Sequence, residues 1–279
     1  MKLMISTALA AALALTLSGC DRQAAGDGAA ASTEAAAASL EALNGTWTVD
    51  LASLKFGGKP DEVLVRDGNY NCATCIPPLT LAADGQFHPV ADRPYYDSAS
   101  VKIVDDRTLE IRRRKGDKEV SSMVQQVSAD GKTATYRFTD MTTPGQKIEG
   151  TTTATRVGEA PAGAHAVSGQ WQPEKVGDYS EEARDIAFEV KGDTVTSTVQ
   201  GQTYVAQLGG PAVAVQGDTG GTTVKVERAG KGLKETFIRG GKEVSVSTIT
   251  PSDDGRSISY SGGDPRDGST TVFTANKKA

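Results

Sequence analysis

Histidine and aromatic residues are scarce in this sequence of 279 residues. It contains two histidines, and aromatic residues make up 5%. His88 precedes Pro89 in an expected turn and His165 lies in an expected linker, so neither fits a Ser/His/Asp catalytic arrangement. The Gly-rich pairs lack the following helix and lysine of a phosphate-binding loop. We therefore expect a protein that acts by binding and not as an enzyme, with no catalytic residue and no cofactor.

An excess of basic residues and a membrane-spanning apolar run are also missing. The chain has 30 Lys and Arg against 35 Asp and Glu, a net charge of -5, so nucleic acid is not an expected partner. The N-terminal apolar stretch from Leu3 to Leu17 is shorter than the ~20 residues that span a membrane as a helix. Because hydrophobic residues make up only 38% of the chain, the composition favours two small cores over one large core.

The N-terminus carries the sharpest localisation signal. Lys2 and the apolar stretch are followed by Leu-Ser-Gly-Cys, ending at Cys20. This segment resembles bacterial lipoprotein signal peptides. The resemblance implies that residues 1–19 are removed, that Cys20 receives acyl chains such as palmitate, and that the protein is exported to the cell envelope. Two or three acyl chains anchor a protein firmly, so we expect a lipid-anchored protein facing the periplasm, with the choice between inner and outer membrane left open.

The segment after the signal peptide is rich in alanine. Residues 20–43 contain no aromatic side chain, and such a composition buries too little apolar surface to offset the entropy of ordering. We expect a flexible tether between Cys20 and the first folded domain.

The rest of the chain repeats itself at an offset of 124 residues (171 minus 47). Three blocks match in register: residues 45–47 (Gly-x-Trp) with 169–171, 118–121 with 242–245, and 128–131 with 252–255. Such a repeat indicates two copies of one domain. The predicted boundaries are 44–157 for the first copy, 158–167 for a linker and 168–279 for the second copy.

Within each copy, Thr and Val recur in short alternating runs broken by Gly, Asp and Pro, and helical periodicity is missing. The pattern predicts strands at 101–104, 108–113, 119–127, 133–138 and 149–157 in the first copy, and at 222–227, 235–238, 243–249, 257–260 and 270–275 in the second. About eight strands per copy would let each sheet close and remove its unpaired edges. We therefore predict an all-β protein with two tandem antiparallel meander β-barrels.

Gly-x-Trp at the head of a meander of this length resembles the lipocalin or calycin superfamily. In lipocalins the tryptophan closes one end of the barrel under a basic residue from the last strand. The resemblance assigns Arg156 to Trp47, and Lys277 as a poorer substitute to Trp171. It also implies noncovalent binding of a small apolar molecule, which we expect in the first barrel because the second copy has few large apolar residues.

Cys72 and Cys75 form a C-x-x-C pair followed by two prolines. The spacing permits a structural disulfide, a dithiol redox couple, or half of a soft-metal site with His88 as the nearest further ligand. An oxidising envelope favours the disulfide. The motif also resembles that of copper-responsive envelope-stress lipoproteins, which implies metal (copper or zinc) or thiol-redox sensing as an alternative function. A further alternative is a protein-binding module, such as an inhibitor of a hydrolase, with an envelope protein as its partner.

Overall fold

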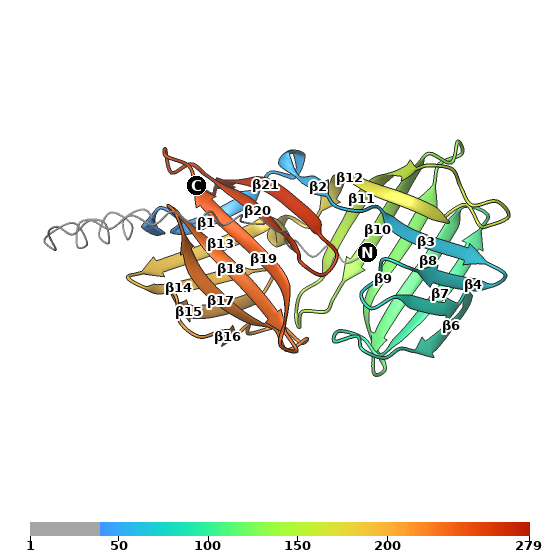
Figure 1. Cartoon of the computed structure of the whole chain (residues 1–279), viewed down its shortest axis with the longest axis horizontal. Helices are drawn as coiled ribbons and strands as arrows, with labels where there is room; N and C mark the ends of the chain where they lie inside the picture. The colour runs from blue at the N-terminus through green and yellow to red at the C-terminus, as the bar shows by residue number, and fades with distance from the viewer. Residues whose placement is uncertain (1–39) are drawn as a thin grey trace, which may run out of the picture.

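The computed structural model describes residues 40–279, so the predicted signal peptide, Cys20 and most of the tether lie outside the described residues. It contains two nearly closed antiparallel β-barrels in tandem, side by side in Figure 1. The predicted fold class is therefore confirmed. Within residues 40–279, no helix is long and apolar enough to cross a membrane.

The first barrel is a meander of ten strands, in the order β5-β4-β3-β12-β11-β10-β9-β8-β7-β6. Its strands are β3 (Asp61–Arg66), β4 (Asn69–Cys72), β5 (Leu79–Ala82), β6 (Asp84–Pro89), β7 (Ser98–Asp105), β8 (Thr108–Lys115), β9 (Lys118–Val127), β10 (Thr133–Asp140), β11 (Ile148–Val157) and β12 (Gly169–Tyr179). All five strands predicted in the first copy are confirmed as β7 to β11. Alternation of buried and exposed side chains along β9 and β10 places one face of the sheet in the core.

The second barrel has the sheet order β15-β14-β13-β1-β21-β20-β19-β18-β17-β16, with β2 paired to β21. Its strands are β1 (Gly45–Val49), β2 (Lys55–Gly57), β13 (Asp185–Lys191), β14 (Thr194–Val199), β15 (Gln202–Gln207), β16 (Val213–Ala214), β17 (Thr223–Ala229), β18 (Gly232–Arg239), β19 (Lys242–Pro251), β20 (Ser257–Asp264) and β21 (Ser269–Lys277). A single bridge, Thr203 with Gln216, links its outer strands. Short 3-10 turns occur at Leu51–Ser53 and Glu181–Arg184.

The two copies exchange their first strands. β1 lies between β13 and β21 of the second barrel, with Gly45 opposite Phe188 and Val49 opposite Ala275. β12, the equivalent strand of the second copy, lies between β11 and β3 of the first barrel. The contiguous boundaries 44–157 and 168–279 therefore do not match the hydrogen-bonded units.

The first barrel is instead one continuous segment, residues 61–179, inserted between β2 and β13 of the second (Figure 1). The connection 158–168 returns the chain so that β12 pairs with its sequence neighbour β11, as consecutive strands commonly do. β12 is then not available to the second barrel, and β1 occupies the equivalent place. Leu40 and Leu43, from the end of the predicted tether, are fully buried in the core of the second barrel with Trp47, so the tether ends earlier than predicted.

Candidate binding cavity in the first barrel

One end of the first barrel is closed by Trp171 and Arg156. The Arg156 guanidinium carbon lies 4.1 Å from the centre of the Trp171 ring. Its nitrogens donate to three backbone carbonyls, of Gly131 at 2.6 Å, Ser168 at 2.5 Å and Ala166 at 2.6 Å. The Trp171 ring is fully buried, and its Nε1 donates to the Val167 carbonyl at 2.8 Å. Stacking and hydrogen bonding thus tie β11, β12 and the neighbouring loops together.

The second barrel is closed in the same way, with a lysine ammonium group in place of the arginine guanidinium. The Lys277 ammonium lies 5.1 Å from the centre of the Trp47 ring, and Trp47 Nε1 donates to the Leu43 carbonyl at 2.8 Å. The predicted pairing of Arg156 with Trp47 and of Lys277 with Trp171 is therefore wrong. The partners change because each tryptophan strand belongs to the barrel of the other copy.

Above Trp171, a cavity of about 500 Å³ extends from the interior of the first barrel to the contact with the second barrel. Its buried walls come from five strands, which contribute Tyr70 (β4), Met123 and Gln125 (β9), Tyr136 (β10), Thr152 (β11) and Trp171 (β12). These side chains follow the period of two that points alternate residues inward. The barrel is therefore not filled by its own side chains.

Several polar groups in this cavity are buried beside aromatic rings. Gln125 Nε2 donates to the Tyr136 hydroxyl at 3.0 Å. Burial raises the pKa of Tyr70 to about 12 and raises the pKa of Tyr136 further, so both phenols are neutral at pH 7. Burial also raises the pKa of Asp61, on β3. The Thr152 hydroxyl is buried and has no hydrogen-bond partner within residues 40–279.

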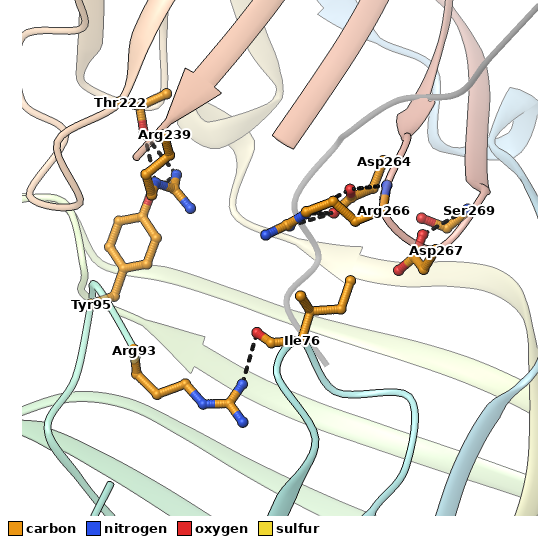
Figure 2. Close-up of polar contacts among 9 residues, drawn as sticks. All are labelled: Ile76, Arg93, Tyr95, Thr222, Arg239, Asp264, Arg266, Asp267 and Ser269. Atoms are coloured by element: carbon orange, nitrogen blue, oxygen red, sulfur yellow. Dashed lines mark hydrogen bonds and ion pairs between the residues drawn. The ribbon is translucent and has the colours of Figure 1, made fainter. Parts of the chain in front are cut away.

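The cavity opens where the two barrels meet (Figure 2). On the side of the first barrel, Arg93 donates to the backbone carbonyls of Ile76, at 2.9 Å, and of Pro77. Tyr95 reaches the second barrel, where its hydroxyl donates to Asp218 Oδ1 at 2.6 Å and accepts from Arg239. On the opposite side of the opening, Arg266 forms an ion pair with Asp264. Polar and cationic groups therefore surround the opening of an aromatic interior.

Cys72 and Cys75 form a disulfide in the cavity wall, with an S–S distance of 2.10 Å and a Cα–Cα distance of 5.4 Å. The bond holds the start of the connection between β4 and β5. His88 lies on β6, where its Nε2 contacts Asp84 Oδ1 at 3.0 Å. Within residues 40–279, no three His, Cys, Asp or Glu side chains are grouped closely enough to hold a metal ion. The proposed metal ligands Cys72, Cys75 and His88 are thus not brought together.

A Cys72→Ser/Cys75→Ser double variant is expected to lower the free energy of unfolding by about 2 kcal/mol, because a four-residue loop restricts the unfolded chain only modestly. Urea denaturation of the variant measures this change, and the wild type with reductant is the matched control. A variant as stable as the oxidised wild type would contradict a stabilising role for the bond.

Comparisons of the chain with protein-family models, with curated proteins and with solved structures give no match. The cavity is therefore interpreted from its own chemistry.

Several residues of this region were not found from the sequence. Tyr70 and Thr152 follow the inward alternation of β4 and β11, which could have placed them in the interior. No local sequence pattern predicts the role of Tyr95, because its hydroxyl donates to Asp218, which lies 123 residues away in the sequence.

Proposed function

We propose that this protein is a membrane-anchored envelope lipoprotein that binds a small, mainly apolar molecule noncovalently in the first barrel. The observation that carries the proposal is the cavity of about 500 Å³ above Trp171. This volume lies within the ~300–1,000 Å³ range of small-molecule sites.

The lining favours an apolar ligand with a hydrogen-bonding group. Tyr70, Met123, Tyr136 and Trp171 offer rings and a thioether, whose contacts with an apolar molecule are favourable. The hydroxyls of Tyr70 and Tyr136 in the same lining offer hydrogen bonds that would orient it. Barrel closure by a basic residue over a tryptophan supports a lipocalin-like assignment.

The anchor is supported by the sequence alone. Cys20 and the apolar segment before it have the pattern of a lipoprotein signal peptide. A lipid on Cys20 would hold both barrels at the membrane surface, where apolar molecules are concentrated.

Filling the cavity is expected to weaken ligand binding. A Met123→Trp variant adds a ring to the interior, and we expect the affinity for the neutral fluorescent probe N-phenyl-1-naphthylamine to fall by about tenfold or more, equivalent to ~1.4 kcal/mol. Val104→Trp, at a position 51% exposed on β7, is the matched control and should bind like the wild type. Probe titration measures both affinities.

Native mass spectrometry of protein purified from its own host would then identify the retained molecule. The ligand-carrier function would be contradicted if no molecule were retained and the wild type did not bind the probe.

Metal or thiol sensing is the second candidate function, because the Cys72–Cys75 bond lies in the wall of this same cavity. Reduction of the bond would change the cavity directly. In this case the double serine variant described above would lose Cu(I) or Zn(II) binding under reducing conditions, and unchanged affinity would eliminate this function.

A further inference from the structure

A second cavity, of about 210 Å³, extends from the interior of the second barrel to its contact with the first. Six aromatic side chains contribute to its walls: Tyr95 from the first barrel, and Phe188 on β13, Tyr204 on β15, Phe237 on β18, Tyr260 on β20 and Phe273 on β21. The rings of Tyr260 and Phe273 are stacked, with centres 4.5 Å apart. This volume exceeds the ~150 Å³ of an engineered apolar cavity that accepts benzene, so it suffices for a molecule with one aromatic ring.

A carboxyl group is buried in this aromatic wall. Glu235, on β18, is 6% exposed and accepts hydrogen bonds from the Tyr204 hydroxyl at 2.5 Å and from Ser247 Oγ at 3.0 Å. A carboxylate accepts up to about four hydrogen bonds, so acceptor capacity remains. Burial raises the pKa of Glu235, and a bound positive charge would oppose that effect.

Within residues 40–279, the hydrogen-bond partners of Glu235 are Tyr204 and Ser247, and no basic side chain forms an ion pair with it. Among the described residues that line the cavity, Arg239 is the one with a basic group, and its guanidinium is bound to the hydroxyls of Thr222 and Tyr95 (Figure 2). Asp140 and Asp218 add two further carboxyl groups to the lining. The cavity therefore has three acidic groups against one basic group, and its charge favours a cation.

The barrel fold does not require this carboxyl group. At the 124-residue offset, Glu235 corresponds to Ile111 (235 minus 124) and Ser247 corresponds to Met123 (247 minus 124). Both pairs are opposite each other in register, Ile111 with Met123 between β8 and β9, and Glu235 with Ser247 between β18 and β19. The first barrel thus folds with an apolar pair at the position where the second has a carboxyl and a hydroxyl group. The polar pair is a specific property of the second cavity.

We propose that the second barrel binds a small organic ammonium ion, with Glu235 as its counter-ion and the surrounding aromatic rings as its walls. Aromatic faces attract cations, and the attraction is stronger in a desolvated site. A metal ion is a poorer fit, since within residues 40–279 no group of three His, Cys, Asp or Glu ligands exists. The two cavities share lining residues where the barrels meet, Tyr95, Asp140 and Arg239 among them, but Glu235 lines this cavity and not that of the first barrel. The proposal does not depend on the proposed apolar site.

Isothermal titration calorimetry of the full chain with three one-ring probes of similar size tests the proposal. We expect benzylamine to bind about tenfold or more tightly than benzyl alcohol, and benzoate to bind more weakly than both. Glu235→Gln, which retains the size of the side chain and one of its two acceptor oxygens, should reduce benzylamine affinity to that of benzyl alcohol. Met123→Trp, in the first barrel, should leave benzylamine binding unchanged.

A second variant keeps the proposal testable if Glu235→Gln does not fold. Glu235→Ile/Ser247→Met installs the pair that the first barrel already uses and should likewise lose the preference for the amine. Equal affinity of the wild type for benzylamine and benzyl alcohol, or no binding of benzylamine, would overturn the proposal. Retention of the amine preference in both Glu235 variants would also overturn it.

Discussion

Trp171→Ala is expected to lower the free energy of unfolding of the first barrel by ~3–5 kcal/mol, the usual cost of removing a buried tryptophan. This effect is expected in the first barrel even though Trp171 belongs to the second copy of the sequence repeat. Its ring is fully buried in the first core and lies under the Arg156 guanidinium. The loss is a large fraction of the ~5–15 kcal/mol that stabilises a typical domain. Amide hydrogen exchange, measured separately for peptides of the two barrels, should show faster exchange in β8 to β11 and little change in β17 to β20.

Trp47→Ala is the matched variant and should give the opposite pattern, because Trp47 packs in the core of the second barrel. If Trp171→Ala increased exchange mainly in the second barrel, the strand exchange would be contradicted.

A fragment of residues 58–183 is expected to fold alone, whereas residues 180–279 are expected to remain unfolded until a peptide of residues 40–57 is added. The first fragment holds every strand of the first barrel, β3 to β12. The second holds β13 to β21 but lacks β1 and β2, and with them the buried side chains Leu40, Leu43, Trp47 and Val49. At ~1.5–3 kcal/mol for each large side chain, their loss approaches the whole stability of a domain.

Circular dichroism and titration with the peptide measure this complementation. A peptide with Trp47→Ala is the control and should bind at least about tenfold more weakly, since removal of the ring costs well over ~1.4 kcal/mol. Residues 180–279 that fold fully without the peptide would contradict the essential role of β1.

Much of the fold was accessible from local pattern. The ends predicted for the strands around Thr108, Glu119 and Thr133 lie within two residues of the observed ends, because alternation and turn residues act over a few positions. Gly116 and Gly240, at the 124-residue offset, have φ of 57° and 56° in the turns after β8 and β18, where glycine avoids the strain of a side chain. The disulfide was likewise favoured by the short spacing of Cys72 and Cys75.

The cavities could not be predicted from local sequence patterns. The scarcity of large apolar residues in the second copy led us to expect the ligand site in the first barrel alone. The inward alternation of β18 could have placed Glu235 beside the core, as it places Leu233. Its contact with Tyr204 depends on strands 31 residues apart meeting across the barrel interior, which no local pattern describes.

The sequence by itself determined where β7 to β11 and β17 to β21 occur, that two copies of one β domain exist, and that both tryptophans are buried. Alternation with a period of two indicates which face of a strand is apolar, but it does not indicate which sheet the strand pairs with. Because the same Gly-x-Trp strand fits either sheet, only the tertiary structure decided that β1 completes the second barrel and β12 the first. The physical reason is that strand pairing depends on which edges the connections leave free, and on the side chains that meet across each barrel.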